Sequence, residues 1–342
     1  MRRIVTLLLL VLVGVPMYAG ESRLSLLGPS AQFTATPVAL APGTTLVQQV
    51  GALRFERGYR LQSPDPSFGG FSSLAVAGDH FTLLSDGGNI VRFRLEATGR
   101  LSERGFAEVP AGPGRGWSKE DRDSESLTVD RRTGQIWVGF ERANQIWRFS
   151  PGLARPQAHS VPGALADWDE NGGPEAMVRL GNGHFIVLSE TTSPAGKPHA
   201  RRAVVFSGDP TQPGTKAAPF TYVPPPGYSP TDIAELPRGD LLVLNRRFSW
   251  ARGFESAVTL VDRRSIAAGS TATAIALAWF AQPLLHDNFE GIAIVPEAHG
   301  VGLWIVSDDN QSVVQQTLLL KFRLDDGDVK RCLARTGCPR NP

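Results

Sequence analysis

The chain has 342 residues, of which 42% are hydrophobic and 20% are charged, as in an ordinary globular protein with a core. Its formal net charge of +2 at pH 7 is close to neutral, and its Lys and Arg residues form no concentrated run. This charge pattern excludes a typical nucleic-acid-binding surface.

The N-terminus has the features of a secretory signal peptide. Arg2 and Arg3 precede an apolar run over residues 4–13, and Gly14, Pro16 and Ala19 follow. The run is short for a membrane span, which needs about 20 residues. We expect a signal peptide at residues 1–19, no membrane span in the remaining chain, and a periplasmic or secreted protein. An uncleaved anchor is the alternative.

A short motif recurs five times after this segment. In each copy an acidic or polar cluster leads into a hydrophobic strand, and the apolar residues that mark the copies are Leu74, Leu127, Met177, Ile233 and Ile292. The steps between them are 53, 50, 56 and 59 residues. A repeat of roughly 40 to 50 residues or slightly more, rich in short strands, is typical of a β-propeller blade. The sequence therefore predicts an all-β propeller whose blades surround one channel.

Each repeat continues with a second and a third strand, and the turns between them are rich in Gly, Asp and Asn. The second strands are expected at residues 81–84, 135–138, 184–188, 240–244 and 303–306, and the third strands at residues 90–95, 145–149, 202–206, 257–261 and 317–324. Fourth strands give weaker signals and are expected at residues 105–109, 158–161, 220–223 and 274–280.

The fifth repeat lacks a fourth strand of its own. Residues 45–61 contain strand-forming sequence that belongs to no repeat, so we expect them to complete the last blade and close the ring. The prediction is five blades of four antiparallel strands in a domain at residues 45–326, after an N-terminal extension at residues 20–44. A sixth blade that uses residues 24–44 is the alternative.

The only two cysteines lie in a polar C-terminal tail at residues 327–342. Cys332 and Cys338 are six residues apart, and in an exported protein their expected role is one local disulfide. A zinc site is not expected, because two thiolates without a nearby His do not complete a ligand set.

The topology of a blade predicts where polar residues converge. The start of the first strand and the end of the antiparallel second strand lie at the same mouth of the channel. The residues at these positions are Ser72, Glu125, Glu175, Thr231 and Glu290 at the starts, and Asp86, Glu141, Glu190, Arg246 and Asp308 at the ends. Seven carboxylates and one guanidinium are thus expected at one opening.

Several carboxylates in a small space repel one another, and a bound divalent cation relieves that repulsion. Oxygen-only ligands favour Ca²⁺ over Zn²⁺, so we expect the seven acids to bind calcium. Glu125, Glu175 and Glu290 are also candidates for catalysis. Arg246 and Arg247 would bind the phosphate or carboxylate group of a substrate.

Two other interpretations stay open. Propellers also use repeated acidic residues to cap turns and to tie neighbouring blades, so the glutamates could belong to the scaffold. Of the six histidines, His286 is the better candidate for acid–base catalysis because it precedes Asp287 and Glu290, although an ordinary surface histidine is the alternative. The sequence contains no G-x-S-x-G, H-E-x-x-H, P-loop or dinucleotide-binding motif.

Several of these segments resemble the phytase-like (esterase-like) family of exported bacterial β-propellers. The similarity extends over roughly residues 68–324, and the segments that carry it include Glu125-Ser-Leu-Thr-Val-Asp130, Gly173-Pro-Glu-Ala-Met177, Ser229-Pro-Thr-Asp-Ile233 and Asn288-Phe-Glu-Gly-Ile292. The resemblance implies hydrolysis of phosphate or carboxylic esters.

One family feature is absent. Alkaline β-propeller phytases carry a calcium-binding run close to D-A-x-D-D-P-A-x-W, whereas the nearest segment here is Glu120-Asp-Arg-Asp123-Ser-Glu125. We therefore expect metal-assisted hydrolysis of a small anionic ester by a monomer, rather than true phytase activity. The alternatives are a non-catalytic envelope propeller that binds a ligand or protein partner, and a lactonase-like enzyme with a single central metal.

Overall fold

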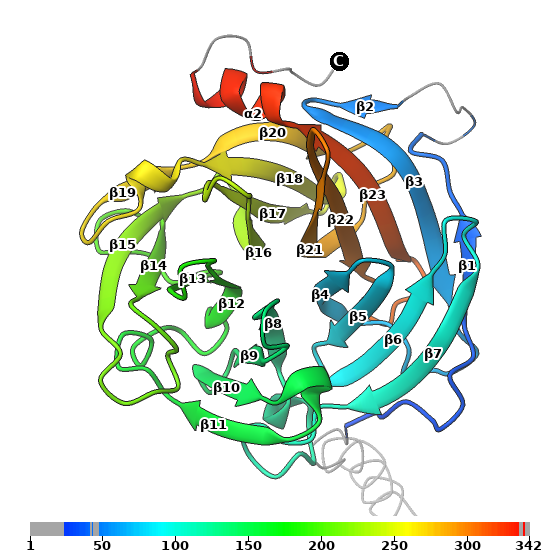
Figure 1. The fold of residues 1–342 in the computed structure, drawn as a ribbon, viewed down its shortest axis with the longest axis horizontal. Coiled ribbons are helices and arrows are strands. Elements are labelled where there is room, and N and C mark those ends of the chain that lie inside the picture. The colour runs from blue at the N-terminus through cyan, green and yellow to red at the C-terminus, as the bar shows by residue number, and fades with distance from the viewer. Residues whose placement is uncertain (1–23, 42, 44–47, 335–337, 339–342) are drawn as a thin grey trace, which may run out of the picture.

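The computed structural model describes residues 24–41, 43, 48–334 and 338. In this part of the chain five antiparallel sheets surround a central axis, so the prediction of an all-β propeller with five blades is confirmed (Figure 1). The predicted signal peptide at residues 1–19 lies outside the described residues. No described helix is long and apolar enough to cross a membrane.

The first three blades follow one another along the chain, each with its first strand nearest the axis. Blade one contains β4 (Phe71–Ala77), β5 (His80–Ser85), β6 (Asn89–Leu95) and β7 (Leu101–Glu108). Blade two contains β8 (Ser124–Val129), β9 (Ile136–Phe140), β10 (Gln145–Phe149) and β11 (Pro156–Ser160). Blade three contains β12 (Pro174–Arg179), β13 (Phe185–Ser189), β14 (Arg201–Phe206) and β15 (Ala217–Val223). The short strand β19 (Thr271–Thr273) pairs in parallel with β15 at the outer edge.

The last two blades complete the ring. Blade four contains β16 (Ser229–Glu235), β17 (Leu241–Ser249), β18 (Gly253–Val261) and β20 (Ile275–Phe280), and blade five contains β21 (Asn288–Glu297), β22 (Gly300–Asp308), β23 (Thr317–Asp325) and β3 (Leu53–Gln62). Short 3-10 helices lie in the connections at Lys119–Asp121 (η2), Pro151–Leu153 (η3) and Arg263–Ser265 (η4).

The ring closes through the N-terminal segment, as predicted. Strand β3 pairs antiparallel with β23 from Leu53↔Leu324 to Leu61↔Thr317. Strand β2 (Gln49–Val50) also pairs with β3. Strand β1 (Thr34–Pro37) adds an outermost strand to the same blade, so residues 24–41 do not begin a sixth blade.

Five hydrophobic clusters, one between each pair of neighbouring blades, hold the described part of the ring together. Aromatic rings cross several of these interfaces. Phe81 of blade one packs edge-to-face on Trp304 of blade five at 4.9 Å between ring centroids. Trp137 of blade two packs in the same way on Phe185 of blade three at 5.0 Å. Burial of these rings fixes each blade against its neighbour.

The C-terminal tail begins with a helix that the sequence analysis did not predict. Helix α2 (Asp326–Leu333) follows β23 directly, with acidic residues in its first turn and basic residues in its last, as its dipole favours. Val329 and Cys332 are buried against the core between blades four and five. Cys332 is joined to Cys338 in a disulfide.

Candidate functional site

The first strand of every blade has a β-bulge at the mouth of the channel. In each pairing of a first with a second strand the register shifts by one residue, and the residues left without a partner are Ser72, Glu125, Glu175, Thr231 and Glu290. These are the same five positions that the repeat predicted. A bulge leaves its extra residue outside the ladder and redirects its side chain, so this distortion sets the five side chains apart from the sheet.

In the two blades without a glutamate the bulge residue ties neighbouring blades together. The hydroxyl of Ser72 donates to the carbonyl of Ser124 at 2.6 Å, and that of Thr231 donates to the carbonyl of Phe289 at 3.2 Å. Asp232 accepts from the backbone N–H groups of Ile233 and Ile292, both at 2.8 Å. The scaffold interpretation therefore applies to these three residues.

Asp232 offers a direct test of this scaffold role. Its side chain is 2% exposed and accepts one of its two hydrogen bonds from the next blade. Asp232→Ala should lower the free energy of unfolding by about 3 kcal/mol, because two buried N–H groups lose their acceptor. The measurement is urea unfolding, with Asp262 as the control. Asp262 is partly buried, pairs with Arg264 and caps η4, and Asp262→Ala should cost only about 1 kcal/mol. If the two variants lost the same free energy of unfolding, the scaffold role of Asp232 would be contradicted.

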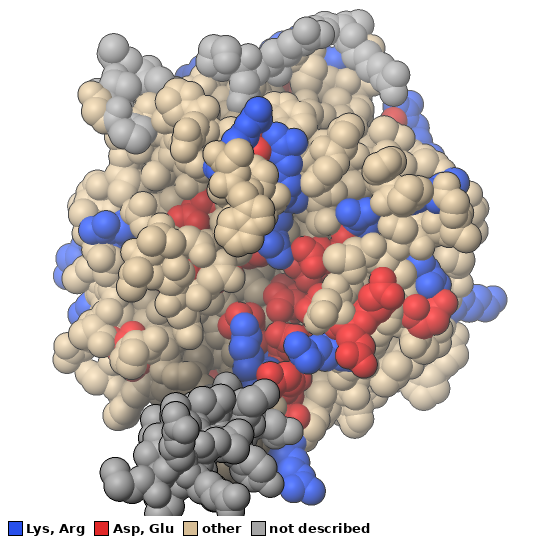
Figure 2. Space-filling view, turned by 180° about the vertical axis from the view of Figure 1, so that it is seen from behind, with Lys and Arg blue, Asp and Glu red and all other residues tan. Residues whose placement is uncertain are grey.

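The glutamates of blades two and three lie in two groups of acids. Asp123, Glu125 and Glu141 each place one carboxylate oxygen within 4.8 Å of the others, and so do Glu141, Glu175 and Glu190. We call these the first and second triads, and Glu141 belongs to both. Figure 2 shows Asp and Glu side chains gathered at the centre of this face, with Lys and Arg side chains beside them.

Three acids of the triads have no positive partner. Among the described residues, no side chain forms an ion pair or hydrogen bond with the carboxylates of Glu125, Glu141 or Glu175. Burial, together with the nearby Asp123 and Glu190, raises the pKa of Glu141 to about 8. Burial and the surrounding acids also raise the pKa values of Glu125 and Glu175 well above the ordinary range. Holding all of these groups ionised is costly without a bound cation.

Glu290 and Asp308 lie in blade five, where they are influenced by both acidic neighbours and Arg246. Burial raises the pKa of Glu290 to about 8, although Arg246 opposes this change. Burial and the charge of Asp86 raise the pKa of Asp308 to about 7. Asn288 donates to Asp308 at 3.3 Å. These two carboxyl groups therefore change protonation close to neutral pH.

Three cations of the described residues form ion pairs with the acids at the mouth. Arg246 pairs with Glu190 at 3.1 Å and with Glu290 at 2.9 Å. Lys119, on η2 in the loop that precedes blade two, pairs with Asp86. Arg142 pairs with Asp123 at 3.1 Å. Eight carboxylates thus share three positive charges, and most of those without one belong to the triads.

The two arginines predicted to bind an anion have different environments. Burial opposes the charge of Arg246, but Glu290 and Glu190 outweigh it and hold its pKa above the usual value. Arg247 points elsewhere, since it pairs with Glu255 at 2.8 Å and lies over the ring of Tyr228 at 4.7 Å. The structure therefore brings Arg246, but not Arg247, to the acids.

The structure does not bring His286 to the acids either. Its Nδ1 lies 2.7 Å from the carbonyl of Leu284, two residues earlier in the same segment, and within the described part of the chain it has no hydrogen bond to a carboxylate of the mouth. Sequence reasoning also left Asp123 and Lys119 out of the site. Asp123 could have been found, because it belongs to the same acidic cluster as Glu125. Lys119 could not, because it lies in an irregular loop outside the repeat.

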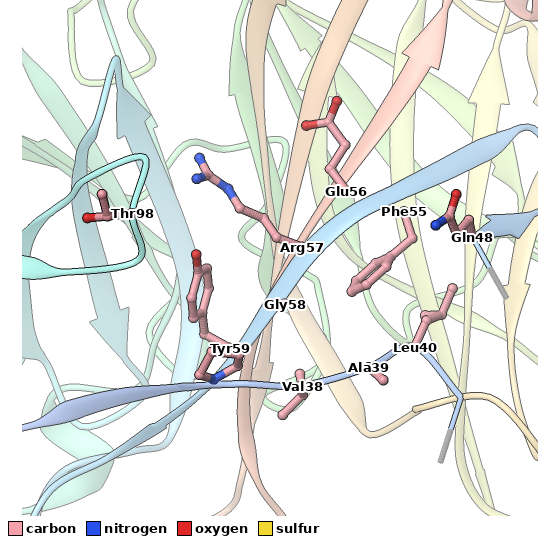
Figure 3. Close-up of a pocket in the computed structure, with 11 residues that line it drawn as sticks. Val38, Ala39, Leu40, Gln48, Phe55, Glu56, Arg57, Gly58, Tyr59 and Thr98 are labelled. Carbon is pink, nitrogen blue, oxygen red and sulfur yellow. The ribbon is translucent and has the colours of Figure 1, made fainter. Parts of the chain in front are cut away.

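A cavity of about 430 Å³ lies on the outside of blade five, away from the acids (Figure 3). Its wall is formed mainly by Val38, Leu40, Phe55 and Tyr59. The charged residues on its rim are engaged elsewhere. Glu56 pairs with Lys321 at 2.7 Å, and the guanidinium of Arg57 lies 5.3 Å from the ring of Trp304. This cavity has no arrangement of groups suited to catalysis.

The sequence matches the phytase-like family, described as "esterase-like activity of phytase", over residues 66–311, which is more than half of the chain. This protein belongs to the phytase-like family. The match agrees with the resemblance inferred from the repeats. No curated protein matches the sequence significantly.

Three solved structures are similar to this phytase-like chain at low identity. PorZ of Porphyromonas gingivalis, a surface component of the type-IX secretion system, is 16% identical, with a TM-score of 0.37, over 87% of this chain and 42% of PorZ. The Swd1 propeller domain of Myceliophteria thermophila is 12% identical, with a TM-score of 0.33, over 74% of this chain and 65% of that one. A candidate 6-phosphogluconolactonase from Bacteroides fragilis is 15% identical, with a TM-score of 0.36, over 90% of this chain and 86% of that one. The chain thus spans less than two thirds of PorZ and of the Swd1 domain.

Proposed function

We propose that this phytase-like protein is an exported hydrolase of a small anionic ester, and that its two triads hold Ca²⁺. The observation that carries the proposal is Glu141, a buried glutamate shared by two groups of acids in which three members lack positive partners. A purely structural acid would be expected to accept hydrogen bonds, as Asp232 does.

The donor set fits calcium. All five members of the triads offer carboxylate oxygens, and Ca²⁺ takes six to eight oxygen ligands from carboxylates, carbonyls and water. No His or Cys belongs to either triad, which disfavours zinc. Asp123, Glu125 and Glu141 would hold one ion, and Glu141 would share in a second with Glu175 and Glu190.

Bound calcium would supply positive charge to neutralise the anionic ester and would favour the ionisation of water. The protein's own groups supply the remaining functions. In the metal-free protein burial raises the pKa of Glu290 to about 8 and that of Asp308 to about 7, so these two groups are the candidates to hold or release a proton as a general acid or base. Arg246 contacts both Glu190 and Glu290, so it fixes their positions relative to each other.

The first test is thermal unfolding of the purified protein with EDTA and with added Ca²⁺, together with hydrolysis of p-nitrophenyl phosphate and p-nitrophenyl acetate. We expect Ca²⁺ to raise the midpoint by an amount that grows with its concentration, and turnover to stop in EDTA. Mg²⁺ serves as the control, because it accepts irregular carboxylate sites poorly.

Other outcomes separate the alternatives. Stabilisation by calcium without turnover of any ester would favour a binding propeller of the envelope. If neither p-nitrophenyl ester is hydrolysed, a lactone is assayed in the same way, and calcium-dependent hydrolysis of the lactone alone would favour a lactonase-like enzyme. If calcium does not change the unfolding midpoint and no ester is hydrolysed, the acids have a structural role only.

A further inference from the structure

The second hairpin of blade four extends beyond the mouth of the channel. In the other blades the second strand ends at the acid that faces the mouth or one residue before it, as β9 ends at Phe140 and β22 at Asp308. Strand β17 continues for three residues past Arg246, and its ladder with β18 extends to Ser249↔Gly253. At about 3.3 Å per residue this extension rises roughly 10 Å above the acids.

One face of this extension is aromatic and continuous with the site. Side chains alternate along a strand, so Phe248 lies on the same face as Arg246. The ring of Phe248 packs on Phe254, its partner across the ladder, at 4.9 Å, and on Trp250 at 5.3 Å. The guanidinium of Arg246 lies 5.9 Å from the ring of Phe254. We call Phe248, Trp250 and Phe254 the aromatic wall.

The opposite face of the hairpin is polar and already paired. Arg247 bonds to Glu255 and covers the ring of Tyr228. The aromatic wall, in contrast, is open to solvent, because Trp250 is 96% exposed and Phe248 is 49% exposed. A Trp and a Phe on one exposed hairpin are costly to leave in water and are typical of binding surfaces.

We propose that the aromatic wall binds the aromatic ring of an aryl ester whose anionic group enters the acidic mouth. The inference rests on the proposed function and names its substrate class. The aromatic wall lies next to Arg246, whose guanidinium is near the ring of Phe254 and pairs with two of the acids. One small molecule can therefore contact both the aromatic wall and the acidic mouth. A ring held edge-to-face or stacked on Trp250 and Phe248 would orient the ester toward the triads.

The test measures ligand binding separately from turnover. The probe, used in the presence of Ca²⁺, is p-nitrobenzylphosphonate, which is not hydrolysed and whose nitro group quenches tryptophan fluorescence. Methylphosphonate is the matched probe without a ring, and the affinities of both probes are measured by titration calorimetry. We expect the aromatic probe to quench the wild type, with the Trp250-dependent part absent in Trp250→Phe. Trp250→Ala and Phe248→Ala should weaken its binding by about three- to tenfold and leave methylphosphonate binding unchanged.

Val313→Ala is the matched control. Val313 is also fully exposed, and it lies between β22 and β23, on the mouth side of blade five. Its replacement should leave the binding of both probes unchanged. Since Trp250 makes little buried contact, Trp250→Ala should retain the wild-type unfolding midpoint. A loss of probe binding in this variant therefore cannot be ascribed to misfolding.

Three results would overturn the inference. The first is an unchanged affinity of Trp250→Ala for p-nitrobenzylphosphonate. The second is Trp250-dependent binding to phosphatidylglycerol vesicles without binding of the probe, which would assign the wall to a lipid surface. The third is a Trp250-dependent dimer with no probe binding. Probe binding without turnover of any ester would contradict the proposed hydrolase activity but not the binding role of the aromatic wall, because binding is measured separately from turnover.

Discussion

Glu141→Gln should abolish the stabilisation by calcium and at the same time make the metal-free protein more stable. Glu141 is the only residue common to both triads, so its loss removes a ligand from each. We expect calcium affinity to fall by at least about 100-fold, since loss of groups that merely orient ligands already costs 10–100-fold. The metal-free midpoint should rise by a few degrees, because one buried carboxylate without a counter-ion is gone.

The measurement is thermal unfolding of wild type and variant over a calcium titration. Glu235→Gln is the matched control. Glu235 lies at the far end of β16, where it accepts from the backbone N–H of Gly181, and its replacement should leave the calcium response intact. A Glu141→Gln protein that calcium still stabilises normally would show that the triads do not bind the ion.

Metal-free protein should lose stability as the pH rises from about 4.5 to about 8. Folding raises the pKa of Glu141 and Glu290 to about 8 and that of Asp308 to about 7. Over this interval the folded state therefore holds protons that the unfolded state has released, and the free energy of unfolding falls with pH. We expect a loss of at least about 3 kcal/mol, since a tenfold change in one acid constant corresponds to about 1.4 kcal/mol.

Calcium should remove most of this dependence, because it stabilises the ionised carboxylates and repays their burial. The experiment follows the unfolding midpoint at pH 5, 6.5 and 8 in chelator and in excess calcium. The variant Glu141→Gln should show a shallower slope in chelator. A metal-free midpoint that is flat or that rises between pH 5 and 8 would mean that these acids are ionised and satisfied without an ion.

Much of the architecture could be predicted because the repeat combines two periodicities. Alternating strand residues and turn glycines located the strands, and the step of 50 to 59 residues indicated blades. The same repeat located Glu125, Glu175 and Glu290, since the bulge falls at one equivalent place in every blade. Equivalent positions in a repeat share a backbone geometry even where their side chains differ.

Apart from Asp123, the features that the sequence analysis missed do not follow the pattern of the repeat. Lys119 reaches Asp86 from an irregular loop, and no pattern predicts where such a loop leads. The extension of β17 was not predicted because Arg246 and Arg247 interrupt the apolar pattern at the point where the strand continues. Helix α2 is only eight residues long, and its cause is burial of Val329 and Cys332, which depends on the folded ring.

Blade five combines strands from both ends of the chain, so the order of synthesis determines when the ring can close. Its outer strand β3 is made near the start of the chain, whereas its partner β23 is made roughly 250 residues later. Until then β3 has no edge to join, and the five interfaces cannot all form. Contacts this distant in sequence slow folding, so the closed ring should be reached only after the whole chain has emerged. A chain that is still attached to the ribosome would therefore remain an open ring, with the outer strand β3 waiting for the inner strands of blade five.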